Sequence, residues 1–401
     1  MKIAYYSHYV GREFAQRAGM GDKNGGSGSL KTQGMARALL KAGHEVTIYS
    51  PGITECGKKI TAFEEIEKFP EGDLHIKYPT IYSFRKCAPI NDVLVRRLLK
   101  KDIKRIRYDA FIYYNIETSL NVLSLFKPDS EILKILEYED NLFNKTQVGT
   151  KTRFAWLKPY IYDYAIKRTD AAFSVCTGML VNGEVKHKLL TPGVINDEVV
   201  GAVSHERHYL RKSEPARLFL IGGGHYCKGS DLLVKSLNYV KHPVHLVFYT
   251  NPKHFFSCAN NEISKIPSKH RVEVRDLISH KELMDILRNE ADILMNCTRS
   301  FGLAPGAAGF PSKMMEYAAM GRPIVSSEIG ILDDEFNSHV TYYEREDVES
   351  LASCIDEVIE NYDSKDISAL ELQKIALCKY TIEGTAKRMT VFFDEIKKAK
   401  S

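Results

Sequence analysis

The stretch that most constrains the fold runs from residue 292 to residue 327. It begins with an apolar run, 292–295, that has the length of a buried strand. A loop rich in Gly and Ala follows, and Pro311-Ser312 then marks the start of a short helix that Gly321 ends before a second apolar strand. This order of strand, loop, helix and strand predicts a parallel α/β unit in which the loop lies at the carboxyl end of the first strand.

Charged side chains at the start of this helix favour an anion beside a polyol. Lys313 opposes the helix dipole but adds a positive charge next to the first backbone N–H groups, which have no partner within the helix. Glu316, one turn along, can accept hydrogen bonds from hydroxyls. A phosphate next to a polyol describes a nucleotide sugar. Ser312, Lys313 and Glu316 are therefore candidate residues for binding a nucleotide sugar, the donor in sugar-transfer reactions.

A second unit of this kind opens the later half of the chain. Its strand, 217–221, is followed by a glycine-rich turn, by Lys228-Gly229 and by a helix expected over 230–239. Further charge for an anion would come from the loop after residue 296. These features add four donor-binding candidates, which are Gly223, Gly224, Lys228 and Arg299.

Residues 218–229 and 310–325 resemble the donor site of GT-B glycosyltransferases, in particular the retaining enzymes of family 4. The resemblance implies that Glu316 binds the ribose of a nucleotide diphosphate sugar, that the lysines neutralise its diphosphate, and that no metal or other cofactor is required. Two positions depart from the pattern. Ala308 stands where many members have a second glutamate, and Gly223 stands where many have an arginine.

The first half of the chain predicts another parallel crossover, with strands at 2–7 and 45–49 around a helix at 29–42. The long loop expected before this helix, over 8–28, ends in a glycine cluster, which makes Gly26 and Gly28 donor-binding candidates. A dinucleotide fingerprint is rejected, because the loop is too long and lysine stands where the third glycine belongs. A surface loop without a ligand remains the alternative.

An acidic cluster, residues 137–140, follows the expected strand 131–136. The carboxyl end of a strand is where a doubly wound domain places its site, and three crowded acids would raise at least one pKa. In the GT-B pattern this strand end lies near the reacting sugar, so Asp140 is the first catalytic candidate and Glu139 the second. A solvated turn stays open as an alternative.

A basic amphipathic helix is expected over 91–107, and an aromatic basic stretch, 151–168, would widen its charged surface. Such a helix can lie on an anionic membrane or form a solvated outer face, and the pattern favours neither. No secretory leader and no apolar run of about 18 residues is found. The expectation is a cytoplasmic protein, with peripheral attachment at the inner membrane face left open.

With 401 residues, the chain is expected to form two domains. The predicted fold is α/β, with two doubly wound parallel-sheet, Rossmann-like domains facing a cleft. Its expected parts are an acceptor-side domain at 1–195, a nucleotide-sugar domain at 196–378 and a helix at 379–401 that crosses back to the first domain. Residues 196–216 are expected to be a linker or an edge segment.

Composition excludes some classes of site and partner. The eight cysteines have no metal-ligand spacing, and the net charge of +5 does not by itself imply nucleic acid. The sequence therefore predicts transfer of a sugar to the hydroxyl of a saccharide or lipid-linked acceptor, in surface polysaccharide or glycolipid synthesis. The alternatives are a nucleotide-sugar epimerase or a sugar phosphorylase on the same fold, or a catalytically silent sugar-binding protein.

Overall fold

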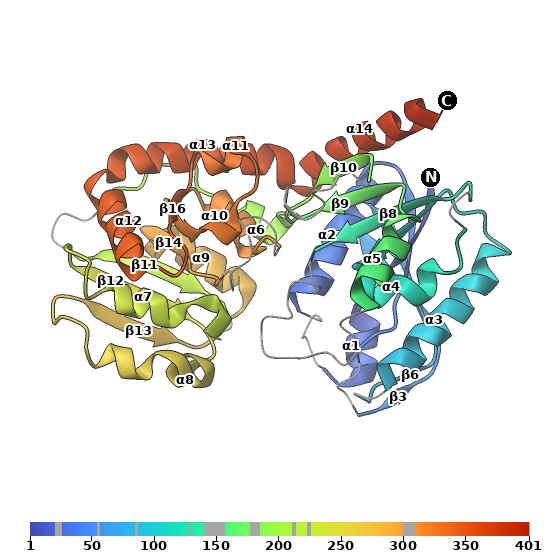
Figure 1. The fold of residues 1–401 in the computed structure, drawn as a ribbon, viewed down its shortest axis with the longest axis horizontal. Helices are drawn as coiled ribbons and strands as arrows, with labels where there is room; N and C mark the ends of the chain where they lie inside the picture. Colours follow the sequence, from blue (N-terminus) through green and yellow to red (C-terminus); the bar gives the residue numbers. More distant parts are fainter. Residues whose placement is uncertain are drawn as a thin grey trace. The chain divides into compact units, whose positions relative to one another are not determined.

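The computed structural model describes residues 1–20, 26–53, 57–84, 87–127, 130–139, 157–176, 185–210, 214–222, 226–299 and 309–400. The chain divides into two compact units (Figure 1). The first contains Met1–Val175, Met179–Val194 and Ile382–Ser401, and the second contains Cys176–Gly178 and Ile195–Thr381. The domain boundaries expected from the sequence, at 1–195, 196–378 and 379–401, remain a prediction.

The first unit is built on a sheet of eight described strands, in the order β10-β9-β8-β7-β1-β2-β5-β4. All neighbours are parallel except β4 and β5, which form an antiparallel hairpin. The strands are β1 Lys2–Tyr6, β2 Glu45–Tyr49, β4 Phe63–Phe69, β5 Gly72–Tyr78, β7 Ala110–Tyr114, β8 Leu133–Tyr138, β9 Ala171–Ser174 and β10 His187–Leu190, with β3 Lys59–Ile60 and β6 Ile81–Tyr82 in a separate ribbon. The helices are α1 Arg12–Ala18, α2 Ser27–Lys41, α3 Ala88–Ile103, α4 Ile116–Leu123, α5 Lys158–Ile166 and α14 Ile382–Lys400.

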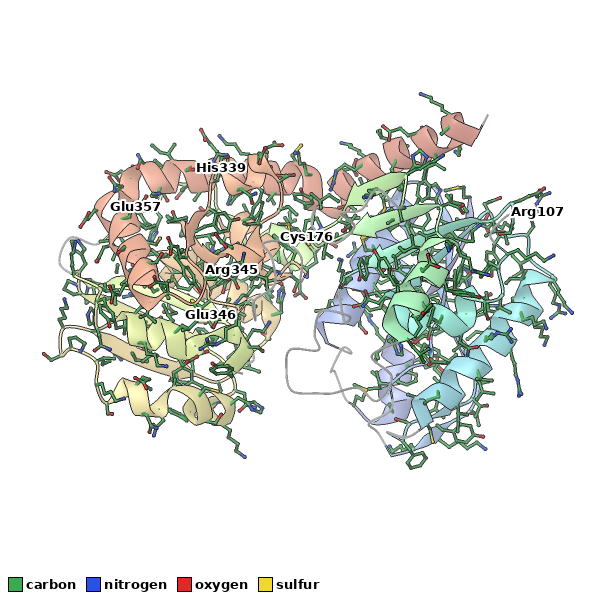
Figure 2. The ribbon with its side chains drawn as sticks, viewed as in Figure 1. Arg107, Cys176, His339, Arg345, Glu346 and Glu357 are labelled. Atoms are coloured by element: carbon green, nitrogen blue, oxygen red, sulfur yellow. The ribbon has the colours of Figure 1, made fainter. Side chains whose placement is uncertain are left out.

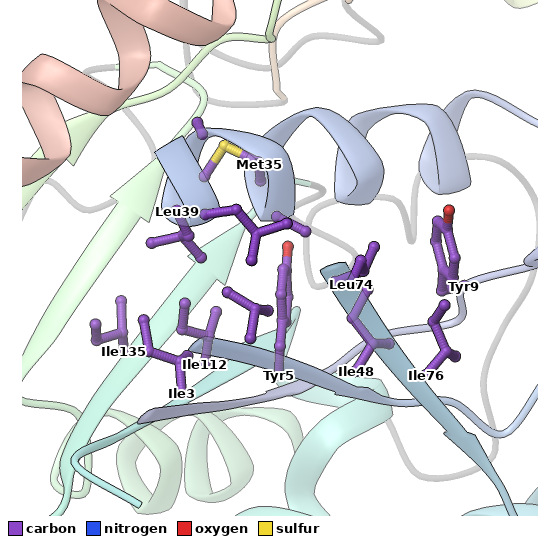
Figure 3. Close-up of a cluster of buried hydrophobic side chains, with 14 of the residues drawn as sticks. Ile3, Tyr5, Tyr9, Met35, Leu39, Ile48, Leu74, Ile76, Ile112 and Ile135 are labelled. Atoms are coloured by element: carbon purple, nitrogen blue, oxygen red, sulfur yellow. The ribbon is translucent and has the colours of Figure 1, made fainter. Parts of the chain in front are cut away.

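Helices α2 and α14 share one hydrophobic core with this sheet. Met35 and Leu39 of α2 lie over Ile3, Ile112 and Ile135 of three neighbouring strands (Figure 3). The side chains of α14 join the same cluster, although α14 is more than 300 residues away in sequence from α2. Each such side chain contributes about 1.5–3 kcal/mol when it is fully buried.

The second unit has a sheet of six described parallel strands in the order β13-β12-β11-β14-β15-β16. The first strand, β11, therefore lies in the middle of the sheet. Strands β12 and β13 are added on one side of it and β14 to β16 on the other, so the strand order reverses between β11 and β14. Doubly wound sheets bind ligands at such a point. The strands are β11 Ala216–Ile221, β12 Val244–Tyr249, β13 Arg271–Arg275, β14 Ile293–Asn296, β15 Ile324–Ser327 and β16 Thr341–Tyr343. The helices are α6 Asp197–Ala202, η5 Tyr226–Lys228, α7 Ser230–Ser236, α8 Pro252–Ile263, α9 His280–Glu290, α10 Lys313–Met320, η6 Glu328–Gly330, α11 Asp334–Asn337, α12 Val348–Glu360 and α13 Tyr362–Tyr380.

The predicted fold class, two doubly wound parallel sheets, is confirmed. Individual bounds differ. The basic helix begins at Ala88, with Pro89 in its first turn, and ends at Ile103 rather than at residue 107. The helix expected over 230–239 ends at Ser236.

The prediction that residues 8–28 form one long loop is wrong, because α1 lies within it. Its N-cap, Gly11, has no side chain to bind the first N–H groups. Two glutamates of β4 supply the acceptors instead: Glu67 binds the N–H of Arg12 at 2.9 Å, and Glu65 binds the N–H of Glu13 at 2.7 Å. A local pattern cannot show a cap that comes from more than 50 residues away.

The expectation of a linker or edge segment over 196–216 is also wrong for its described part. Asn196 caps α6 by accepting a hydrogen bond from the N–H of Val199 at 2.9 Å. Further along, His208 Nε2 lies 2.6 Å from Asp292 Oδ1 at the start of β14. The segment is therefore packed into the second unit.

Candidate functional site

A glycine brings the end of β14 against the start of α7. Gly229, the N-cap of α7, has a φ of 67°, which side-chain-bearing residues rarely adopt. A Cβ atom at this position would also overlap the carbonyl oxygen of Cys297 just after β14. The turn that carries Lys228 can therefore lie against the carboxyl end of β14, at the point where the strand order reverses.

Lys313 reaches the same edge of the sheet from α10. Its Nζ donates a hydrogen bond to the carbonyl oxygen of Ile221, the last residue of β11, at 3.3 Å. Burial is the larger cause and the nearby charge of Lys228 the second, and together they lower the pKa of Lys313 to about 7. Two lysines that are 85 positions apart in sequence thus place positive charge at the carboxyl ends of the central strands.

Arg299, a third candidate, is held by the protein itself. Its Nη2 binds both oxygens of Asp231 at 2.9 and 2.7 Å, and its Nη1 lies 3.0 Å from Glu346 Oε2 (labelled in Figure 2). Its Nε donates to the carbonyl oxygen of Tyr226 at 3.1 Å, and its guanidinium lies 4.0 Å from the centre of that ring. Arg299 therefore fixes the η5 turn that ends in Lys228, and its role as a direct donor ligand stays a prediction.

Glu316, the candidate ribose ligand, is paired with a histidine that the sequence did not single out. Its Oε1 lies 3.1 Å from Nε2 of His280, the first residue of α9. The other ring nitrogen, Nδ1, lies 2.9 Å from Oε2 of Glu198 in α6. The hydrogen bond to Glu316 is the largest cause that raises the pKa of His280 to about 9.

The remaining donor candidates of the second unit are less defined. Ser312 is the exposed N-cap of α10, and its side chain makes no capping hydrogen bond. The N–H groups of Met314 and Met315 bind the carbonyls of Pro311 and Ser312 at 2.9 and 3.1 Å. Gly223 and Gly224 lie outside the described residues, as does Ala308.

In the first unit, Glu139 lies just after β8 among polar groups. It forms an ion pair with the buried Lys31, and it accepts a hydrogen bond from the Tyr114 hydroxyl at 3.2 Å. Its N–H donates to Oδ1 of Asn115 at 2.9 Å, and Asn115 holds a positive φ of 51°. A Cβ atom at Gly28 would lie 3.8 Å from the Tyr114 hydroxyl, so Gly28 borders the same cluster.

The other candidates in the first unit lie away from this cluster or outside the described residues. Gly26, the N-cap of α2, has a φ of 80°, and no atom lies within 4 Å of a Cβ built there. Asp140 lies outside the described residues.

The raised pKa expected of the acidic cluster is found at Glu137, at about 8, but burial is its largest cause and the charge of Glu139 comes second. Glu137 lies in the core and accepts a hydrogen bond from the Tyr5 hydroxyl.

Sequence reasoning missed Lys31, Tyr114, Glu198 and His280 as members of these clusters. The capping box of Ser279 and Glu282 is a local sequence signal for the start of α9, and therefore for the position of His280. Nothing in the local pattern shows that this helix start meets α10.

Some features are not found within the described ranges. No group of three or more His, Cys, Asp or Glu side chains there could hold a metal ion. No described helix is both long enough and apolar enough to cross a bilayer. A pocket of about 720 Å³ in the first unit is lined by the starts of β1, β2 and β5. It therefore lies at the amino edge of the sheet, away from the candidate site residues of that unit.

Comparison with known proteins gives a family match in the second unit and a fold for the whole chain. Residues 215–361 match the family described as Glycosyl transferases group 1. No curated protein matches the chain in sequence.

Three similar solved structures illustrate the fold. Sucrose-phosphate synthase from Thermosynechococcus elongatus has a TM-score of 0.69 at 14% identity, with 100% of each chain covered. HepE from Anabaena in complex with UDP has a TM-score of 0.61 at 10% identity, covering 98% of this chain and 100% of its own. The lipopolysaccharide outer core galactosyltransferase WaaB, in its apo form, has a TM-score of 0.61 at 12% identity, with 100% of each chain covered. At these identities the likeness establishes the fold, which is GT-B.

Proposed function

We propose that this glycosyltransferase of the GT-B fold, whose residues 215–361 form a glycosyl transferases group 1 domain, moves a sugar from a nucleotide diphosphate sugar to an acceptor hydroxyl. The observation that carries the proposal is the meeting of Lys228 and Lys313 at the carboxyl ends of β11 and β14. The departing diphosphate gains negative charge as its bond to the sugar breaks, and fixed positive charge at that place stabilises the transition state. HepE, a structure of the same fold, is in complex with UDP.

We also propose that the transfer retains the anomeric configuration. In such a transfer the acceptor oxygen bonds to the anomeric carbon, the diphosphate leaves with the electron pair of the broken bond, and the hydroxyl proton passes to the departing phosphate. Glu139, held by Lys31 and Tyr114, is the described candidate for a group near the reacting sugar; Asp140, the first candidate from the sequence, lies outside the described residues. The two lysines supply the charge that a divalent metal would otherwise provide, so we expect activity to persist in EDTA.

A screen with UDP, GDP and ADP sugars carrying a labelled sugar tests the proposal. One donor should be transferred, or slowly hydrolysed when no acceptor is present, and the matching nucleoside diphosphate at about 100 times its Kd should add about 2.7 kcal/mol to the free energy of unfolding. Lys228→Ala, Lys313→Ala and Glu316→Ala should each lower kcat/KM, by roughly 100-fold for the lysines. Product analysis separates transfer from epimerisation and phosphorolysis.

The matched control is Lys269→Ala. Like Lys313, Lys269 donates to a backbone carbonyl, that of Lys241 at 2.8 Å, but it precedes β13 and lies at the opposite edge of the sheet. Its variant should keep full activity. If no sugar nucleotide is consumed, or if the site variants behave like the control, the proposal is wrong.

We propose further that the acceptor is a saccharide or a lipid-linked saccharide of surface polysaccharide or glycolipid synthesis, and that α3 attaches the chain to an anionic membrane. In support, six basic residues of α3 and the segment after it are exposed, with Arg107 labelled in Figure 2. They are Arg97, Lys100, Lys101, Lys104, Arg105 and Arg107. The first turns of the helix expose apolar side chains instead, Ile90 at 50% and Val93 at 41%. Basic and apolar groups together suit a lipid surface.

Vesicle sedimentation tests this attachment. The protein should sediment with vesicles that contain phosphatidylglycerol and not with pure phosphatidylcholine vesicles. Reversing Arg97, Lys100 and Lys101 to glutamate should weaken partitioning by roughly 100-fold or more, because the loss of three positive charges alone removes about 1 kcal/mol each and the new negative charges repel the anionic lipid. Reversal of Lys387, Lys397 and Lys398 in α14 serves as control, and equal loss from both sets would contradict a role for α3.

A further inference from the structure

His280 lies between two carboxylates from different helices. Nε2 is 3.1 Å from Glu316 Oε1 and Nδ1 is 2.9 Å from Glu198 Oε2, so α9 is tied to both α10 and α6. Both contacts are hydrogen bonds only if both ring nitrogens carry a proton, because a carboxylate can only accept. The imidazole is therefore a cation in this arrangement.

The contact with His280 engages one oxygen of Glu316. Within the described residues, Oε2 of Glu316 has no recorded hydrogen bond, and the side chain is 30% exposed. A glutamate at a helix surface otherwise has several rotamers, and fixing one before a ligand arrives reduces the entropy lost on binding. The capping box of Ser279 and Glu282 fixes His280 in turn, because it sets the first residue of α9.

We propose that His280 is the positioning residue for Glu316, and that the pair prepares one carboxylate oxygen to accept hydrogen bonds from the ribose hydroxyls of the donor nucleotide. Glu198 completes the arrangement by engaging the far side of the imidazole. This inference rests on the proposed donor site. It goes beyond that site by assigning a role to two residues that do not themselves touch the nucleotide.

A structural ion pair that only fastens α9 to α10 is the competing explanation. The two explanations differ in which ligands should respond to a change at His280. A fastening role would affect every ligand of the second unit, whereas a positioning role should affect only ligands with ribose hydroxyls. In the proposed site pyrophosphate would contact the lysines but offers no ribose, so it serves as the internal reference.

The test is calorimetric titration of the full chain with UDP, GDP, ADP and pyrophosphate. His280→Ala should weaken the nucleoside diphosphate that binds by about tenfold, the typical value of a hydrogen bond between charged groups, and leave pyrophosphate unchanged. His280→Gln should recover part of the loss, because its amide can donate to Glu316. A 2′,3′-dideoxy form of the same nucleotide should bind the wild type weakly and lose nothing further in His280→Ala.

The matched control is His242→Ala. His242 Nε2 also pairs with a glutamate, Glu360 Oε1 at 3.1 Å, but it precedes β12 at the amino edge of the sheet. This variant should bind every ligand as the wild type does.

The outcomes separate the two claims. Equal loss of pyrophosphate and nucleotide in His280→Ala, or unchanged or tighter nucleotide binding, overturns the positioning role while the donor site stands. If the wild type binds no nucleoside diphosphate, the proposed function fails, and the inference fails with it.

Discussion

The ammonium group of Lys313 is in an unfavourable place in the ligand-free protein. It is withdrawn from water and it faces the charge of Lys228, and together these lower its pKa to about 7. A bound diphosphate would favour the charged form. Nucleotide binding above pH 7 should therefore take up a proton, and affinity should fall by up to about tenfold per pH unit in that range.

Titration of the matching nucleoside diphosphate in buffers of different ionisation enthalpy measures this uptake. Near pH 8 the wild type should take up a fraction of a proton that Lys313→Arg does not, because arginine stays charged. The stability effect has the opposite sign: the lowered pKa destabilises the folded state below about pH 7, and this cost disappears as the pH approaches the ordinary lysine value. Affinity that is independent of pH from 7 to 9 would contradict this role for Lys313.

At the residue scale, the sequence could identify groups whose neighbours in the chain reveal their position. Lys313 and Glu316 follow a helix start, and Lys228 follows a glycine-rich turn, so their place at strand ends could be predicted. Their partners could not. His280 meets both Glu316 and Glu198 only because three helices pack together, and each of the three is an ordinary polar residue in its own segment.

At the element scale, α1 depends on carboxylates from the β4 edge strand. Glu65 accepts the N–H of Glu13 at 2.7 Å and that of Phe14 at 3.4 Å. Glu65→Ala leaves these N–H groups without their acceptor, so the opening free energy of α1 should fall by about 1–3 kcal/mol. Hydrogen exchange of residues 12–18 measures it.

The control for this prediction is the neighbouring residue of the same strand. Glu64 points to the other face of β4, where it is exposed and pairs with Lys77 at 3.3 Å. Glu64→Ala should change the opening free energy by less than about 0.5 kcal/mol. If both variants leave α1 equally protected, Glu65 does not cap the helix.

Elements with a local signal were predicted well, and those without one were not. The bounds of α12 can be read from the sequence, because its apolar residues recur at helical spacing and Asp347 caps it. The start of α1 has no such signal, because Gly11 is its N-cap and its acceptors come from β4. The basic helix was predicted over 91–107 but spans Ala88–Ile103. The predicted end is too far along the chain, because the charged residues continue beyond Ile103 into a turn.

At the scale of the whole molecule, buried strands without alternation predicted two parallel sheets, and both are observed, with β4 as an antiparallel edge strand of the first. The order of strands needed the structure, because each crossover can place the next strand on either side. In the second unit that order brings Ile221 and Cys297 to adjacent strand ends, which explains why segments 85 residues apart hold one candidate site.

The central claim is that the second unit holds a donor diphosphate between Lys228 and Lys313, with its ribose at Glu316. A crystal structure of the chain with the nucleoside diphosphate that stabilises it tests this claim most directly. The account predicts phosphate oxygens within hydrogen-bonding distance of both lysine Nζ atoms and ribose hydroxyls within that distance of Glu316. A nucleotide bound elsewhere, or one held without either lysine, would contradict it.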